Sequence, residues 1–361
     1  MDTPSRFRTL IVAEIVRETP ESVSIGFDVP DELAETFAFT PGQYLTLAAE
    51  IDGDEARRSY SICSMPGETR LRVGVKRVAD GRFSRFVNER LAIGDTIRVM
   101  PPEGRFTALI GGRHDYLLIA AGSGITPMLS IARTVLGHEP DSTITLVYGN
   151  RSTDAIMFLE ELGDLKDRYL GRFTLVHLLS REAQDVDILN GRIDAERIRL
   201  LASRGLIDPA GADGVFLCGP GAMIEDVSAA LKSLGVAGDR IRFERFTPAG
   251  DALAPRKPSE AVEKAVAKGV PVEVMLDGVR RSFVVSDPAQ TVLDAAHRAG
   301  IELPYSCAGG MCCTCRCRVV EGKTEMAVNF SLQPWEIEAG FTLACQSRPV
   351  SEKLVLDFDA A

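Results

Sequence analysis

The sequence is poor in the residues that most often carry acid–base chemistry and bind single metal ions. Among 361 residues it has only four histidines and eight cysteines. The histidines are scattered along the chain, so we assign no catalytic role to any of them: His114, His138, His177 and His297. So few cysteines in so long a chain, with no secretory segment before them, argue against a disulfide framework.

Long hydrophobic runs are also missing. The short run Leu10 to Ala13 has acidic neighbours and no small-residue cleavage pattern after it, which favours a first strand over a signal peptide. The most apolar later stretch, Tyr116 to Leu129, is interrupted by glycines and a proline, so we expect no membrane span. A net charge of -10 disfavours nonspecific nucleic-acid binding. We therefore expect a cytoplasmic protein that binds neither membranes nor nucleic acid.

The first two thirds of the chain show two different hydrophobic patterns. Residues 1–108 contain short alternating runs separated by turn pairs such as Asp52-Gly53, which predicts an antiparallel β-barrel. In residues 109–247, apolar runs alternate with helical stretches, which predicts an α/β domain with a parallel sheet covered by helices. The length of the chain also favours several domains over one.

The last third begins with a stretch that lacks a core pattern. Residues 248–268 look like a linker, with a short helix around 259–267. In residues 269–361, two strand-like runs flank Asp277-Gly278, a strong hairpin signal, and a short helix then ends at Gly300. We expect a third domain here, of mixed α+β structure.

Four cysteines in this third domain have the spacing of cluster ligands. Three lie on one loop, with four and then two residues between them, and 29 residues separate the third from the fourth: Cys307, Cys312, Cys315 and Cys345. This is the plant-type spacing for a two-iron, two-sulfur cluster, and Gly309 and Gly310 let the loop curl around it. Zinc is the alternative, although a second separated CxxC pair is missing. Cys313 and Cys317 read as packing residues, with a ligand role as the alternative.

Three segments indicate nucleotide cofactors: an R-x-Y-S segment and two glycine-rich turns. The R-x-Y-S segment falls between two strand-like runs. Arg58, Tyr60 and Ser61 combine a cation, an aromatic ring and a hydroxyl, which suits a flavin. The alternative is that Arg58 and Tyr60 are an ordinary cross-strand pair. Residues 122–127 follow the first parallel strand and open a helix, and residues 218–221 end a later strand. Both turns should lie at one sheet edge, where dinucleotides bind, although either could be a simple strand-to-helix turn.

Together with Glu244-Arg245-Phe246, these motifs resemble the ferredoxin-NADP reductase superfamily fused to a plant-type ferredoxin domain of β-grasp fold. The resemblance covers essentially the whole chain. It implies that FAD binds at Arg58, Tyr60, Ser61, Lys76, Gly81, Arg82, Phe83 and Ser84. It implies that the nicotinamide dinucleotide binds at Gly122, Gly124, Thr126, Arg151, Ser180, Arg181, Cys218, Gly219 and Pro220. The residues nearest the reacting rings would be Tyr60, Ser61, Cys218, Glu244 and Phe246, and Cys63 would be a packing residue.

Ser180-Arg181 resembles the pair that binds the 2′-phosphate in NADP-dependent members of this superfamily. The guanidinium supplies the charge that a phosphate needs, and neither position holds a carboxylate that would accept a ribose hydroxyl. The resemblance therefore favours NADPH. A solvated arginine at a strand end is the alternative, and it would leave NADH open.

The order of flavin, nicotinamide and ferredoxin domains is similar to that of the reductase components of bacterial oxygenases. Residues 148–151, 191–194, 307–317 and 326–331 look like the reductases of phenylacetyl-CoA epoxidase systems, which degrade phenylacetate. Reductases of steroid-hydroxylating Rieske oxygenases share the segment 345–349. The resemblance implies electron transfer from NAD(P)H through FAD and the cluster to an oxygenase component on separate chains.

Three other functions fit the motifs less well. The electron-transfer component of dihydroorotate dehydrogenase has its cluster cysteines closer together than the 29-residue separation here. An iron–sulfur redox sensor would not need both glycine turns and the R-x-Y-S segment. A self-sufficient oxygenase would need a diiron motif or a Rieske Cys-His pair, and the sequence shows neither.

Overall fold

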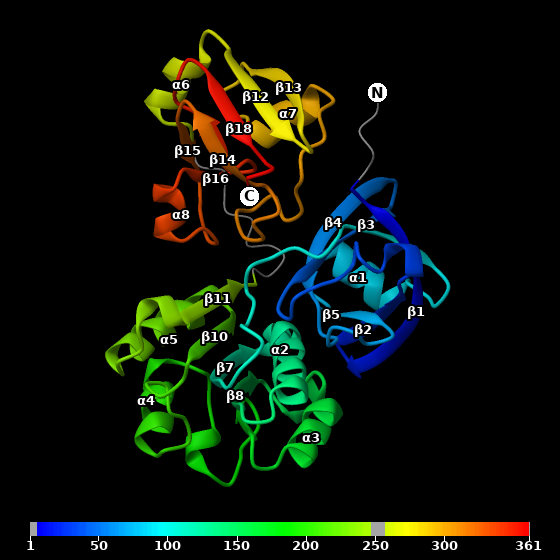
Figure 1. Ribbon diagram of the computed structural model, residues 1–361, viewed down its shortest axis with the longest axis vertical. Coiled ribbons are helices and arrows are strands. Elements are labelled where there is room, and N and C mark those ends of the chain that lie inside the picture. Colours follow the sequence, from blue (N-terminus) through cyan, green and yellow to red (C-terminus); the bar gives the residue numbers. More distant parts are fainter. Residues whose placement is uncertain (1–5, 247–256, 361) are drawn as a thin grey trace. The chain divides into compact units, whose positions relative to one another are not determined.

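The computed structural model describes residues 6–246 and 257–360. The chain forms two compact units, Met1–Gly250 and Asp251–Ala361, each with its own sheets and hydrophobic core (Figure 1). Within the described residues, no helix combines the length and apolarity that a membrane crossing requires.

The first unit begins with a six-stranded antiparallel sheet in the order β4-β3-β6-β1-β2-β5. Alternate residues of these strands enclose one core, and helix α1 (Arg82–Glu89) contributes Phe83 and Val87 to it. This confirms the predicted barrel. The R-x-Y-S segment lies inside β4, paired with β3, and not between two strands as the sequence had suggested. The strands are β1 (Arg8–Thr19), β2 (Ser22–Asp28), β3 (Tyr44–Ile51), β4 (Asp54–Ser61), β5 (Leu71–Lys76) and β6 (Thr96–Val99).

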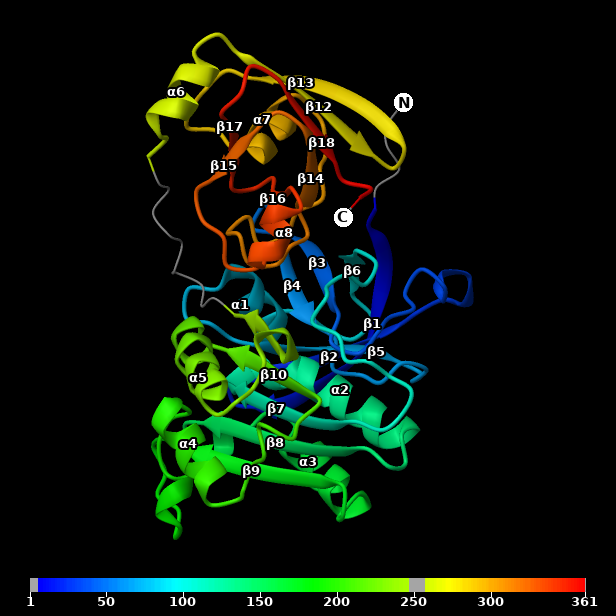
Figure 2. The same ribbon diagram turned by 60° about the vertical axis from the view of Figure 1, so that its left-hand side comes forward.

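The same unit continues with a five-stranded parallel sheet in the order β11-β10-β7-β8-β9. Helices α2 and α3 cover one face and α4 and α5 the other, which confirms the predicted α/β domain (Figures 1 and 2). The strands are β7 (Asp115–Ala121), β8 (Thr143–Asn150), β9 (Phe173–Leu179), β10 (Gly214–Gly219) and β11 (Ile241–Arg245). The helices are α2 (Ile125–His138), α3 (Leu159–Arg168), α4 (Ala195–Ser203) and α5 (Gly221–Ser233).

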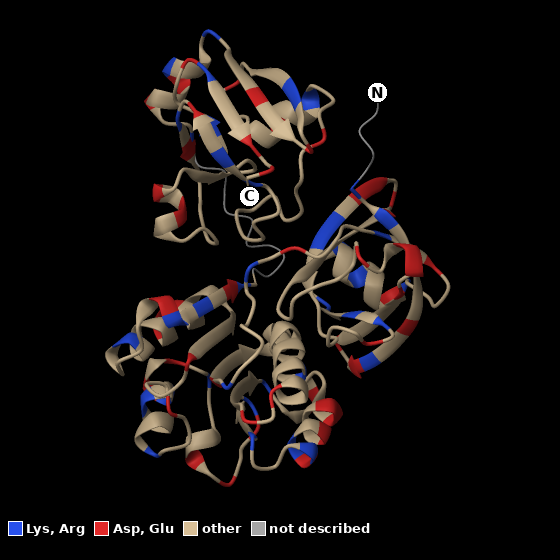
Figure 3. Ribbon diagram, viewed as in Figure 1, with Lys and Arg blue, Asp and Glu red and all other residues tan. Residues whose placement is uncertain are grey.

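The barrel packs directly on this α/β layer through β5. A Cβ on Gly74 would lie 2.6 Å from Cγ2 of Thr126 and 3.1 Å from Cε of Met157, so only glycine allows this approach. Beside it, Arg72 of β5 forms an ion pair with Glu161 of α3, with Nη2 and Oε1 2.7 Å apart. Basic and acidic residues are interspersed throughout this unit (Figure 3).

The second unit combines a five-stranded mixed sheet, in the order β13-β12-β18-β14-β16, with a two-stranded sheet, β15-β17. The predicted hairpin is present as β12 and β13, and Gly300 adopts φ +73 after α7. The strands are β12 (Val270–Leu276), β13 (Val279–Val285), β14 (Arg316–Glu321), β15 (Thr324–Met326), β16 (Phe341–Leu343), β17 (Ser347–Pro349) and β18 (Leu354–Asp357), and the helices are α6 (Glu260–Val266), α7 (Val292–Arg298) and α8 (Pro334–Glu338).

The helix predicted around residues 259–267 is α6, capped by the Ser259 side chain. Its Val262 and Val266 are buried in the core of the second unit, so this part of the predicted linker is folded against that unit. Residues 248–256 of the predicted linker lie outside the described residues. The exact domain boundaries stay a prediction.

Candidate functional site

The two predicted glycine turns meet at the carboxyl edge of the parallel sheet. Gly122 follows β7 with φ +54 and opens the short 3-10 turn Gly122–Gly124, and α2 follows directly. A Cβ on Gly124 would lie 2.2 Å from the Cys218 carbonyl oxygen at the end of β10, so the two turns touch. Thr126 donates its hydroxyl to the Ser123 carbonyl and stabilises the turn. This edge is where parallel α/β sheets bind dinucleotides.

Four of the five residues predicted nearest the reacting rings come together here. Cys218 of β10 is paired with Glu244 of β11 in the parallel register, and the Phe246 N–H donates to the Gly219 carbonyl. The Ser61 hydroxyl, at the end of barrel strand β4, donates to Oε2 of Glu244 at 3.1 Å. The barrel and the α/β layer thus share one hydrogen bond at the predicted reaction site.

The carboxyl group of Glu244 is perturbed by this location. Burial raises its pKa to about 7, and the Ser61 hydroxyl opposes that rise by hydrogen bonding to the carboxylate. Burial also raises the pKa of the neighbouring Cys218 thiol. Both groups are therefore held toward their neutral forms, which suits a place where the reduced nicotinamide ring, which carries no charge, would stack.

The raised pKa of Glu244 predicts a pH-dependent stability. A carboxyl whose pKa rises on folding holds its proton more tightly in the folded protein, so it stabilises the fold below its ordinary pKa of 4.5 and loses that contribution as the pH rises to about 7. We expect the thermal midpoint of the wild type to fall relative to that of Glu244→Gln between about pH 5 and about pH 8. A difference between the two midpoints that stays constant with pH would contradict this assignment.

Tyr60 lies beside these residues on the barrel strand. Its ring centroid is 5.8 Å from that of Phe83, and burial raises its pKa, so it stays a neutral phenol. Arg58, on the same face of β4 two residues earlier, is exposed, so its guanidinium can reach an anion. This arrangement fits a flavin ring against Tyr60 with its phosphates toward Arg58.

The predicted phosphate segment forms the start of helix α1. Gly81 is the N-cap, and a Cβ there would lie 2.4 Å from the Ser84 hydroxyl. That hydroxyl accepts from the Val78 N–H and donates to the Gly81 carbonyl, while Phe83 is buried in the barrel core. The side chains of Phe83 and Ser84 therefore face inward, and we expect the helix N-terminus and the Arg82 guanidinium to meet a phosphate.

Lys76, predicted to line the phosphate side of FAD, also lies close to the dinucleotide turn. Its Nζ is 3.9 Å from the position that a Cβ on Gly122 would occupy, so it faces the dinucleotide turn as well as the barrel. Burial lowers its pKa, and Arg151 adds to that lowering. Sequence reasoning missed this placement because Lys76 and Gly122 belong to different sheets.

Arg151 and Arg181 are brought together at the ends of β8 and β9. The Arg181 N–H donates to the Arg151 carbonyl at 2.7 Å, and the Ser180 N–H donates to the Asn150 carbonyl. Both arginine side chains are exposed. These backbone contacts place Arg151, Ser180 and Arg181 at one sheet edge, and arginine and serine are residue types that suit a phosphate monoester.

Four of the six cysteines of the second unit form two pairs. The Cys307 and Cys312 thiols hydrogen-bond to each other, as do those of Cys315 and Cys345. The Cys312 thiol and the N–H groups of Gly309 and Met311 lower the pKa of Cys307. In residues 6–246 and 257–360, no three histidine, cysteine or acidic side chains converge as ligands of a single ion.

These pairs fit a two-iron, two-sulfur cluster. Each pair offers two thiolates to one iron, and backbone N–H groups already point at the sulfur atoms, as a cluster requires. The loop curls through left-handed residues at Ala308 and Gly310. Cys313 is also left-handed within the loop, whereas Cys317 is fully buried in the core, which fits the packing role predicted for it. Cys63 is likewise buried in the core of the first unit.

Two polar contacts around the cysteines were not expected from the sequence. The Gln346 side-chain amide lies 3.7 Å from the Cys345 sulfur and donates to the Ala308 carbonyl, so it ties the distant ligand to the loop. Arg316, next to Cys315, forms a buried ion pair with Glu336 of α8 at 2.9 Å. Gln346 and Ala308 are 38 positions apart, and Arg316 and Glu336 are 20 positions apart, so no local motif could have indicated either contact.

Three family models match successive parts of the chain. The oxidoreductase FAD-binding domain matches residues 10–108, the oxidoreductase NAD-binding domain residues 118–229, and the 2Fe-2S iron-sulfur cluster binding domain residues 274–350. The matches follow the order of the barrel, the parallel sheet and the cysteine loop. FAD, a nicotinamide dinucleotide and a 2Fe-2S cluster are thus the cofactors of these domains.

Among the relatives that match over nearly their full length are a subunit of an epoxidase and a component of a monooxygenase. The chain is 46% identical over 360 residues to one of the proteins that make up the 1,2-phenylacetyl-CoA epoxidase of Escherichia coli K12, covering 98% of both chains. It is 38% identical over 358 residues to the ferredoxin reductase component of 3-ketosteroid-9-alpha-monooxygenase from Rhodococcus rhodochrous, covering 98% of this chain and 97% of that one. The solved structure of phthalate dioxygenase reductase shares the fold, with a TM-score of 0.59, 22% identity and 98% coverage of both chains.

Proposed function

The chain belongs to the family of flavin and iron–sulfur oxidoreductases that serve as reductase components of oxygenases, and we propose that it carries electrons from NADPH to the oxygenase of a phenylacetyl-CoA epoxidase system. The contact that supports this most directly is the Ser61–Glu244 hydrogen bond, because it closes the barrel onto the parallel sheet beside Cys218. The 46% identity over 98% of both chains supports the choice of partner.

The bound cofactors would supply the redox chemistry: two electrons arrive together from the nicotinamide and leave the flavin singly for the cluster. The residues of this chain hold and orient the groups. Tyr60 would support the flavin ring, Gly122 and Gly124 would admit the dinucleotide phosphates, and Cys218 and Phe246 would border the nicotinamide. Ser61 and Glu244 would fix the edge where the two rings meet. The protein contributes orientation and electrostatics, and it needs no general base.

The proposal includes NADPH as the preferred donor. Replacing Arg181 with alanine removes one guanidinium from the predicted 2′-phosphate site, and a charge-assisted hydrogen bond is worth about a tenfold change in binding or more. We expect the KM for NADPH to rise about 10-fold and the KM for NADH to change less than about 2-fold. Steady-state reduction of ferricyanide by each donor measures both constants.

The matched control is Arg204→Ala, which removes an exposed guanidinium after α4. It should leave both KM values unchanged. Equal increases for NADPH and NADH in Arg181→Ala would contradict the phosphate assignment and leave the donor preference open.

Reconstitution with purified oxygenase components tests the partner. We expect NADPH consumption coupled to phenylacetyl-CoA turnover when the epoxidase oxygenase is added. Coupling to a ketosteroid Rieske oxygenase instead would favour the second candidate, which the 38% identical relative supports. Reduction of the cluster without transfer to either oxygenase would favour the redox sensor.

The proposal also includes a cytoplasmic location. Reducing compartments keep cysteine side chains as thiols. The cluster loop needs four of them as thiolates, so an oxidising compartment would compete with cluster assembly.

A further inference from the structure

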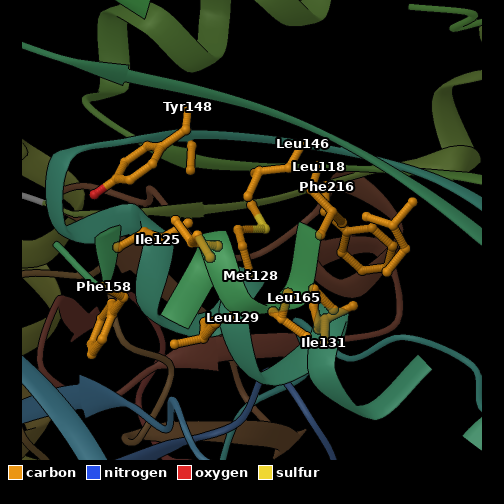
Figure 4. Packing of buried hydrophobic residues seen from close by; sticks show 14 of the residues in the cluster. Leu118, Ile125, Met128, Leu129, Ile131, Leu146, Tyr148, Phe158, Leu165 and Phe216 are labelled. Carbon is orange, nitrogen blue, oxygen red and sulfur yellow. The ribbon is translucent and has the colours of Figure 1, made fainter. Parts of the chain in front are cut away.

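A tyrosine hydroxyl lies directly beneath the dinucleotide turn. Tyr148 of β8 is fully buried, and its hydroxyl donates to the Gly122 carbonyl at 2.9 Å. Figure 4 shows the ring within the core, with its hydroxyl directed to the side where Ile125 begins α2. Burial raises the pKa of Tyr148, so the hydroxyl keeps its proton and remains a donor.

This hydrogen bond fixes the direction of a backbone donor on the opposite side of the turn. The Gly122–Ser123 peptide is trans and planar, so the Gly122 carbonyl and the Ser123 N–H point in opposite directions. Because the carbonyl points at Tyr148 in the core, the Ser123 N–H points away from the core. An N–H group at this edge, before a helix, is placed to meet a phosphate oxygen.

The turn needs this support because its backbone is unusual. Gly122 adopts φ +54. Glycine can adopt many other backbone conformations of similar energy, so the sequence alone does not hold the turn in this one. Its carbonyl also accepts from the Ile125 N–H, so the tyrosine adds a second constraint. Removing the hydroxyl would leave the fold intact while allowing the peptide to rotate.

The same hydroxyl lies beside the segment that seats the barrel. The backbone of Met157 is next to it, and Met157 Cε and Phe158 Cζ each lie 3.1 Å from the Cβ position of Gly74 in β5. Phe158 itself adopts φ +58, so this corner of the chain is tightly constrained. Tyr148 therefore connects the turn to the surface on which the flavin barrel rests.

We infer that Tyr148 is a positioning residue, whose buried hydroxyl holds the Gly122 peptide so that the Ser123 N–H receives the pyrophosphate of the nicotinamide dinucleotide. The inference rests on the proposed function only for the identity of the donor. It concerns binding geometry, so it should affect affinity and not the rate of flavin reduction in the saturated complex.

Tyr148→Phe tests this in the holoenzyme. We expect the Kd for NADP+, from the difference spectrum of the bound flavin, to rise about 3- to 10-fold, as for the loss of one hydrogen bond. The rate of flavin reduction at saturating NADPH should change less than about 2-fold. Hydrogen exchange, measured by mass spectrometry on the peptide containing residues 121–126, should become faster.

Tyr116→Phe is the matched control. Tyr116 is buried in the same core on β7, and its hydroxyl donates to the Leu109 carbonyl at 3.0 Å, at the opposite end of the strand. We expect a comparable loss of thermal stability in both variants, with an altered Kd and altered exchange of the turn only in Tyr148→Phe.

Three results would overturn the inference: an unchanged Kd in Tyr148→Phe, equal increases of Kd in both variants, or loss of the flavin from Tyr148→Phe alone. The last would mean that the hydroxyl supports the fold and not the turn. A wild-type flavin that neither NADPH nor NADH reduces would instead contradict the proposed function, so the two failures are distinguishable.

Discussion

The Cys345→Ser variant is expected to keep its flavin and its NADPH-dependent reduction of ferricyanide, while its reduction of cytochrome c falls to background. Cys345 approaches Cys315 from a separate element, just after β16, and this pair would hold one of the two irons. A serine oxygen is a poor replacement for a thiolate in a cluster of this type. The measurement compares both acceptors in one preparation and records the paramagnetic signal after reduction with dithionite.

The control is Cys313→Ser, which makes the same chemical change in the same loop. Cys313 lies between two predicted ligands but belongs to neither of the sulfur pairs. This variant should retain the paramagnetic signal and the reduction of cytochrome c. If Cys313→Ser lost the cluster and Cys345→Ser kept it, the assignment of ligands would be wrong, although the flavin half of the protein would be unaffected.

The cysteine site could be predicted because cluster binding requires a particular spacing of cysteines along the chain. Three ligands on one loop must follow each other at intervals that let the backbone surround a cluster, and that constraint is visible in the sequence. The structure brings Cys345 to the same place, as the separate fourth ligand required.

The glycine turns could be predicted for a different reason. Parallel strands place all their carboxyl ends at one edge, so two turns that follow such strands must be neighbours even when about 100 residues separate them. The register of Cys218 opposite Ala120 confirms that step. The hydrophobic period of the strands and the topology of a parallel sheet were together sufficient to predict that the two glycine turns are neighbours.

The contacts that cross between layers could not be predicted. Lys76 reaches Gly122 only because Gly74, two residues earlier, lets β5 pack tightly against Thr126. The Tyr148 hydroxyl meets the Gly122 carbonyl across two strands, and the apolar run of β8 gave no indication that its tyrosine had a polar partner. Such pairs depend on how two surfaces pack, which no local pattern records.

Ser61→Ala is expected to slow flavin reduction by NADPH on the order of 100-fold, the usual effect of losing one preorganised hydrogen bond at a reacting centre. The Ser61 hydroxyl donates to Glu244 at 3.1 Å and so aligns the barrel edge with the β10–β11 edge. Stopped-flow absorbance of the flavin, at saturating NADPH, measures the step directly. Ser59→Ala removes the same group two residues earlier on β4, where the hydroxyl faces Thr46, and it should react at nearly the wild-type rate. Equal slowing in both variants would mean that β4 responds to any lost hydroxyl, and Ser61 would then have no special part in the reaction.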